Sequence, residues 1–311
     1  MPSEAAAATA AASDQTGNQV IDEKFAGSMC FVVTLMRALE SARADRIVSD
    51  PFAEPLTRKA RPTLMPVLES WAKKEQHPSS FMALRTRYLD EALDQRNPNI
   101  RQIVLLGAGL DARAYRLESL RGAHVLEIDQ SDRIFAHKQQ VMDELEAPLI
   151  AAKHDCIVAD LLEASWEKKL LDSGFDPTIP TFWAMEGLLM YLDRESNITL
   201  LQTIDSLSAS GSALWADMSG EVMLKQAELK LLKAVDSLKD AEARQGLLSH
   251  GEDDPLQGVL SEIPWQLEQQ ASLRSAGTHF GREWTPILSG ESKQPVSFTF
   301  LVGEKPLAVA A

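Results

Sequence analysis

The sequence predicts an α/β domain built on a mostly parallel sheet. Two observations carry this prediction. Short apolar runs alternate with helical segments through the middle of the chain, which is typical of parallel strands joined by crossover helices. A glycine-rich loop directly follows the first of these runs. The apolar runs are nearly continuous, as expected for strands buried on both faces. We expect strands at 102–106, 124–128, 155–158, 180–185 and 212–218.

The organisation of the chain follows from changes in its pattern. Residues 1–20 contain no basic residue and no leucine-rich segment, so we expect a disordered tail rather than a targeting peptide. One domain is expected over 21–311. It comprises a helical cap at 21–98, a ligand-binding core at 99–219, a late helical insertion at 220–295, and a closing strand and tail at 296–311. Amphipathic spacing in the insertion fits a lid or a solvated helix pair equally well.

Composition excludes several classes of partner. The 311 residues carry a formal charge of −14, which disfavours nucleic acid and an acidic membrane surface. Neither the two cysteines nor the six histidines show the spacing of a zinc site, so no metal is predicted. The low cysteine content fits a reducing compartment, and a cytoplasmic location is expected.

The glycine loop indicates a nucleotide-like ligand. Gly107 and Gly109 follow a strand with Ala112 three residues on, a fingerprint that lets backbone approach a ligand closely. A tight turn without a ligand shows the same pattern. Asp129, at the end of the next strand, stands where an acidic residue meets ribose hydroxyls. NAD and S-adenosylmethionine both present such a ribose, so these residues leave both cofactors open.

Further acidic residues favour a cationic ligand. Asp111 in the first helical turn would oppose a pyrophosphate. Asp160 ends the third strand, where it could accept the adenine amino group or act as a helix N-cap. Glu186 follows the apolar fourth strand, and a carboxylate there needs either a ligand or a buried partner. Together these residues suit an ammonium and a sulfonium better than two phosphates.

Several ordered segments resemble one family. They are "ARADRIVSDPFAEPL", "LRTRYLDEAL", "IVLLGAGLDARAYRL", "VLEIDQ", "VADL" and "GFDPTIPTFWAMEGLLMYL". In these segments the chain resembles the leucine carboxyl methyltransferase-like family of S-adenosylmethionine-dependent methyltransferases, in particular its bacterial-type branch of O-methyltransferases. The resemblance implies the Rossmann-like class I methyltransferase fold, with a seven-stranded sheet in which "VSFTFLVG" supplies one antiparallel strand.

The resemblance also implies roles for individual residues. Arg85 would hold the methionine carboxylate of S-adenosyl-L-methionine, and Glu186 would face its amino group. Asp129 would take the ribose hydroxyls, and Asp160 with Leu161 would flank adenine. Gly107 and Gly109 would form the loop under the cofactor. Lys24 does not match the basic residue that leucine carboxyl methyltransferases use near the N-terminus.

The expected function is methyl transfer to an oxygen atom. The acceptor is a small molecule or another carboxylate-bearing or hydroxyl-bearing compound, and the sequence assigns neither a general base nor an oligomeric state. Two alternatives stay open: an NAD-dependent Rossmann oxidoreductase, and a methyltransferase-like module that binds the cofactor without turnover.

Overall fold

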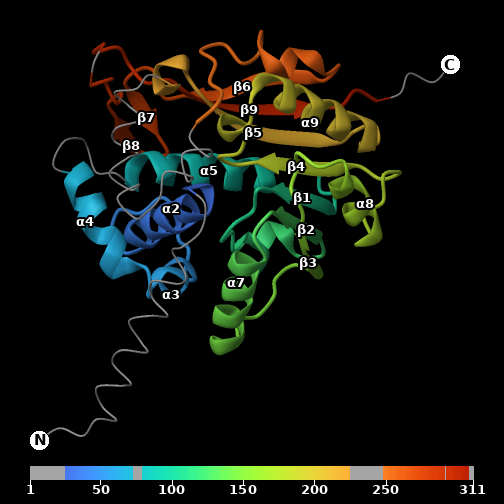
Figure 1. Ribbon diagram of the computed structural model, residues 1–311, viewed down its shortest axis with the longest axis horizontal. Helices are drawn as coiled ribbons and strands as arrows, with labels where there is room; N and C mark the ends of the chain where they lie inside the picture. The colour runs from blue at the N-terminus through green and yellow to red at the C-terminus, as the bar shows by residue number, and fades with distance from the viewer. Residues whose placement is uncertain (1–24, 73–78, 225–247, 291, 308–311) are drawn as a thin grey trace, which may run out of the picture.

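The computed structural model describes residues 25–72, 79–224, 248–290 and 292–307. A seven-stranded sheet in the order β3-β2-β1-β4-β5-β9-β6 runs through its centre (Figure 1). Strand β9 pairs antiparallel with both of its neighbours, while the other neighbouring pairs are parallel. The class I methyltransferase sheet implied by the resemblance is therefore confirmed. The strands are β1 Gln102–Leu106, β2 His124–Asp129, β3 Lys153–Val158, β4 Thr181–Met185, β5 Ala213–Ser219, β6 Gln266–Ser272 and β9 Phe298–Glu304.

Helices cover both faces of the sheet and bury two apolar layers. One layer contains Phe31 and Leu84 from the N-terminal helices, packed with Ile103 and Val125 of the strands. Trp166 belongs to the other layer. In Figure 1 the N-terminal helices α2 to α4 and the pair α8 and α9 lie on opposite sides of the molecule. The α-helices are α2 Phe25–Ser41, α3 Ala53–Thr57, α4 Arg61–Ala72, α5 Ser79–Gln95, α6 Arg113–Arg116, α7 Asp132–Glu144, α8 Ser165–Asp172 and α9 Arg194–Leu207.

The late part of the chain differs from the predicted helical insertion at 220–295. It contains β6 and a small hairpin of β7 Gly277–His279 and β8 Arg282–Trp284. Short 3-10 turns lie at Glu221–Leu224 and Val259–Glu262. The prediction missed β6 because this edge strand is rich in polar residues and mostly half-exposed, so it lacks an apolar signal. The longest predicted helical run, 221–245, falls mainly outside the described residues, as does the predicted tail at 1–20.

The opposite edge of the sheet also departs from the expected pattern. Strand β3 is the edge strand next to β2, and it is largely exposed or half-exposed, not buried on both faces. Within the described ranges, no helix has the length and apolar character that crossing a membrane requires.

Candidate functional site

The loop after β1 adopts the backbone that its glycines permit. Gly107 and Gly109 have φ of +66° and +51°, in the left-handed region that side chains disfavour. A Cβ at Gly109 would lie 3.0 Å from Cys30 Cβ, and one at Gly107 would lie 3.2 Å from Leu188 Cδ1. The loop is thus tightly enclosed, and it lies directly against the turn that follows β4.

Asp129 ties the end of β2 to this loop. Its Oδ2 accepts a hydrogen bond from Gly109 N at 2.8 Å, and its Oδ1 accepts one from Ser131 N at 3.0 Å. Burial raises the pKa of Asp129, although these two N–H donors oppose the shift. A carboxylate has about four lone-pair positions, so each oxygen keeps acceptor capacity for a ligand.

Asp160 and Leu161 follow β3 at the same edge of the sheet. Ala159 N donates to Asp129 O at 2.9 Å, which places this segment beside the end of β2. Asp160 Oδ1 accepts from Leu162 N at 2.9 Å, and both Asp160 and Leu161 are half-buried. Helix α8 begins only at Ser165, with Ala164 as its N-cap, so Asp160 does not cap that helix.

Glu186 and Arg85 form an ion pair at the end of β4. Arg85 Nε, from α5, lies 3.1 Å from Glu186 Oε1, and the two side chains are only 7% and 11% exposed. Burial alone would raise the pKa of Glu186, but Arg113 and Arg85 outweigh it and hold this pKa far below its usual range. The structure therefore brings together two of the predicted cofactor-binding residues from positions 101 apart in the chain.

Arg113 is the centre of this charged cluster. Its Nη1 lies 2.7 Å from Glu186 Oε2, and its Nε lies 2.7 Å from Asp90 Oδ1. It also pairs with Asp111. Because Arg113 is 1% exposed, its charge is balanced only by these carboxylates. Sequence reasoning assigned it no role, although it stands in the segment that follows the glycine loop.

Asp111 is paired with Arg113, so its charge does not oppose a pyrophosphate as its sequence position suggests. We interpreted Asp111 as a charge that would oppose a pyrophosphate. Its side chain instead accepts from Arg113 N at 2.7 Å and pairs with the Arg113 guanidinium. A neutralised carboxylate gives no reason to reject a dinucleotide, so Asp111 does not discriminate between the cofactors.

Asp217 is a second residue that the sequence analysis missed. Its Oδ1 accepts from Gly187 N at 2.5 Å, and its Oδ2 lies 3.6 Å from Arg85 Nη1. Burial raises the pKa of Asp217 to about 6, and Arg85 only partly opposes this. An acid within the buried strand β5 carries the same signal that singled out Glu186, namely the cost of burying a carboxylate without a partner.

Sequence comparisons identify relatives of this chain. A protein from Mycobacterium marinum, named as a candidate S-adenosyl-L-methionine-dependent methyltransferase, is 33% identical over 290 residues, covering 89% of this chain and 94% of that protein. A relative of the same kind from Streptomyces coelicolor is 41% identical over 197 residues, covering 60% of this chain and 64% of that protein.

Solved structures share the fold at low sequence identity. A DUF574 family protein from Streptomyces avermitilis superposes with a TM-score of 0.50 at 12% identity, covering 88% of this chain and 97% of that one. A candidate methyltransferase from Thermobifida fusca gives a TM-score of 0.50 at 14% identity, covering 88% and 94%.

The fold and the relatives define the class: the protein is an S-adenosyl-L-methionine-dependent methyltransferase, and its cofactor is S-adenosyl-L-methionine. More particularly, residues 30–205 match the leucine carboxyl methyltransferase model, and the chain belongs to that family. The family assignment favours this cofactor over NAD, the choice that the glycine loop and Asp129 left open.

Proposed function

We propose that the protein transfers the methyl group of S-adenosyl-L-methionine to an oxygen atom, in a carboxylate or a hydroxyl group of its acceptor. The observation that carries the proposal is the buried Arg85–Glu186 pair, which lies at the end of β4 beside the glycine loop. The acceptor oxygen is inferred from the family, whose name describes a carboxyl methyltransferase.

The pair of opposite charges suits the methionine end of the cofactor. The amino-acid group of S-adenosyl-L-methionine is a zwitterion, so it brings one positive and one negative charge. We assign its carboxylate to Arg85 and its ammonium to Glu186, which retains Arg113 as a second partner. Inserting a zwitterion into an existing ion pair leaves the net buried charge unchanged, and each charge of the ligand then meets an opposite partner, which offsets its desolvation.

The adenosine end is assigned to residues at the ends of β2 and β3. The loop of Gly107 and Gly109 would pass under the cofactor, and at both positions the tight contacts with Leu188 and Cys30 and the positive φ favour glycine. Asp129 would accept the ribose hydroxyls with the lone pairs that its backbone donors leave unused. Asp160 and Leu161, both half-buried, would flank adenine.

Methyl transfer requires the protein mainly to align the methyl donor with the acceptor and to exclude water. The bound cofactor supplies an electrophilic methyl group on a sulfonium. Arg85 and Glu186 hold its amino-acid end in place, and the acceptor oxygen must approach in line. A carboxylate acceptor is ionised at neutral pH and needs no base, whereas a hydroxyl acceptor gains from one.

The first test is calorimetric titration with S-adenosyl-L-methionine, S-adenosylhomocysteine and NAD in parallel. We expect the first two to bind and NAD not to bind. Binding of NAD alone would contradict the proposal, and binding of none would place the protein among methyltransferase-like modules with a closed site.

The second test identifies the atom that is methylated. The protein is incubated with methyl-labelled cofactor and a panel of carboxylic acids, phenols, alcohols, amines, thiols and carbon nucleophiles, and the products are then treated with mild base. Methyl esters release labelled methanol under these conditions, whereas methyl ethers do not. Transfer to nitrogen, sulfur or carbon acceptors alone would overturn the assignment to oxygen, and cofactor binding without any transfer would support a module without turnover.

A further inference from the structure

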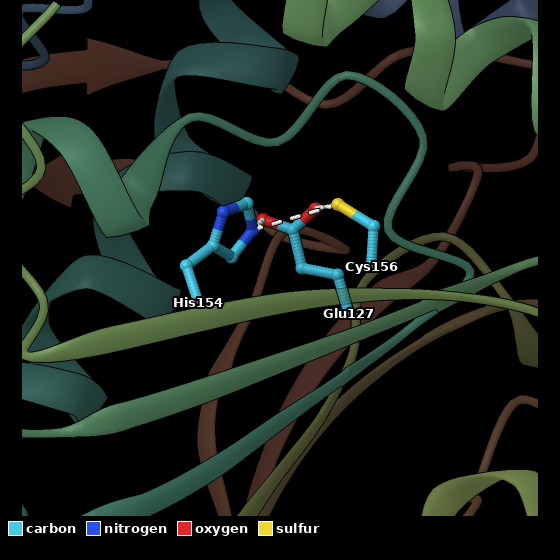
Figure 2. Close-up of side chains that lie close together, drawn as sticks. All are labelled: Glu127, His154 and Cys156. Atoms are coloured by element: carbon cyan, nitrogen blue, oxygen red, sulfur yellow. Dashed lines mark hydrogen bonds and ion pairs between the residues drawn. The ribbon is translucent and has the colours of Figure 1, made fainter. Parts of the chain in front are cut away.

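A second polar cluster lies on the β2–β3 edge of the sheet, outside the residues assigned to the cofactor. Glu127 of β2 stands in register beside Cys156 of β3, and His154 lies two residues before Cys156 on the same face. Figure 2 shows the imidazole, the carboxylate and the thiol directed toward one another. They offer one nitrogen, one oxygen and one sulfur ligand atom within 4.8 Å of one another.

The distances between the nitrogen, oxygen and sulfur atoms of the cluster match those between ligands of a single metal ion. His154 Nε2 lies 3.0 Å from Glu127 Oε1, Cys156 Sγ lies 3.9 Å from Glu127 Oε2, and Sγ lies 3.8 Å from Nε2. Zinc holds nitrogen and oxygen at about 2.0–2.2 Å and sulfur at about 2.3 Å. Neighbouring ligands around such an ion therefore lie roughly 3–4 Å apart, as these do.

Other side chains already orient two of these three groups. Tyr115 Oη lies 3.4 Å from His154 Nδ1, the ring nitrogen that faces away from the cluster. Lys138 contacts the Glu127 carboxylate and donates to Asp111 O at 3.1 Å. Hydrogen bonds to the far nitrogen of a histidine and to a ligating carboxylate are the usual outer partners of a protein metal site.

We propose that Glu127, His154 and Cys156 bind a divalent transition-metal ion of the zinc type. The nitrogen, oxygen and sulfur set suits zinc, and three protein ligands leave one coordination position open. Cys156 is exposed, which gives an ion access from solvent, while Glu127 is fully buried and anchors the site to the sheet. The sequence predicted no metal because this site forms only when two strands pair.

Lys138 opposes a bound cation, and two anionic ligands offset this repulsion. One is the Glu127 carboxylate, which Lys138 contacts. The other is the thiolate that a cysteine supplies when it ligates a metal ion.

The test is calorimetric titration of tag-free, reduced full-length protein with Zn²⁺, for the wild type, Cys156→Ser and Cys30→Ser. We expect one ion per chain in the wild type and in Cys30→Ser, and at least tenfold weaker binding in Cys156→Ser. The control is matched, because Cys30 is the other cysteine of the chain and is not part of the cluster. Circular dichroism checks that both variants fold.

A second measurement needs no variant. Co²⁺ in place of Zn²⁺ should give a sulfur-to-cobalt charge-transfer band in the near ultraviolet, which reports the thiolate ligand directly. Absence of stoichiometric Zn²⁺ binding, equal binding by Cys156→Ser, or a Co²⁺ complex without that band would each overturn the proposal. None of these results bears on the proposed methyl transfer.

Discussion

The two ends of the proposed cofactor site are built differently. At the methionine end, Arg85, Arg113, Glu186 and Asp217 are almost completely buried and paired with one another across elements far apart in the chain. At the adenosine end, Asp129 and Asp160 are half-buried, and the hydrogen bonds found for their carboxylates come from backbone N–H groups. One end therefore depends on long-range ion pairs and the other on local backbone geometry.

This difference predicts which substitutions lower the stability of the fold and which weaken cofactor binding. A buried ion pair that loses one partner leaves an uncompensated charge, which costs several kcal/mol. Replacing a partly buried carboxylate that accepts backbone hydrogen bonds costs less, since the groups left without a partner are neutral N–H donors and not charges. We therefore expect substitutions at the methionine end to alter folding as well as binding, and those at the adenosine end to alter mainly binding.

The largest effect is expected for Arg113→Met. Removing this guanidinium leaves Glu186, Asp90 and Asp111 with fewer partners in the interior, and we expect the free energy of unfolding to fall by about 3–5 kcal/mol. Urea denaturation measures the change. Arg121→Met is the control, because Arg121 forms an exposed pair with Glu118 and its loss should change stability by less than about 0.5 kcal/mol. Equal stability of the two variants would contradict the contrast between the two ends.

Asp217→Asn should alter how stability depends on pH. The pKa of Asp217 is raised to about 6 in the folded protein from an ordinary value of 3.8. Folding therefore favours the protonated form, so the wild type loses stability relative to the variant as pH rises from about 4 to 6. The loss amounts to roughly 3 kcal/mol and is constant above that range. Urea denaturation of both proteins at pH 4.5 and 7.5 tests this, and parallel pH profiles would contradict it.

Arg85→Gln should weaken binding of S-adenosyl-L-methionine by about 1.5–3 kcal/mol, the range for a hydrogen bond to a charged group. Calorimetry measures the affinity. Arg87→Gln on the same helix is the control, since Arg87 pairs with the half-buried Glu91. If Arg85→Gln keeps its folded circular dichroism spectrum and binds S-adenosyl-L-methionine as tightly as the wild type, the assignment of Arg85 to the cofactor is wrong.

The smallest effect is expected at the adenosine end. Asp129→Ala should weaken cofactor binding by about 1–3 kcal/mol, since the ribose hydroxyls lose their acceptor. We expect a smaller loss of stability than for Arg113→Met, because the substitution leaves two neutral backbone donors, Gly109 N and Ser131 N, without a partner and strands no buried charge. Unchanged affinity would remove the ribose assignment.

The sequence predicted the parallel core of the fold because buried strands are apolar. Strands β1, β2, β4 and β5 were each expected within one residue of their observed bounds. Strand β6 was missed because it pairs with β9 at the far edge while its own residues, "QLEQQAS", are mostly polar. Pairing with a neighbour stabilises an edge strand whatever its periodicity, and a single sequence does not reveal the neighbour.

The sequence singles out individual residues of the proposed site, but not the partners that the structure gives them. Glu186 was singled out as a carboxylate in an apolar run, but the two arginines that balance it come from other elements. The pairing of Arg85 with Glu186 joins residues 101 apart, which no local spacing indicates. Asp217 carried a local signal and was passed over, whereas the cluster of Glu127, His154 and Cys156 depends on strand register, which one sequence does not reveal.

The most direct measurement compares S-adenosyl-L-methionine with adenosine as ligands for Arg85→Gln and Asp129→Ala. Adenosine lacks the amino-acid group, so Arg85→Gln should weaken binding of S-adenosyl-L-methionine about tenfold or more and leave that of adenosine unchanged. Asp129→Ala should weaken both ligands to a similar extent. Equal weakening of both ligands by Arg85→Gln, or weakening of neither, would contradict the assignment of the buried ion pair to the methionine end.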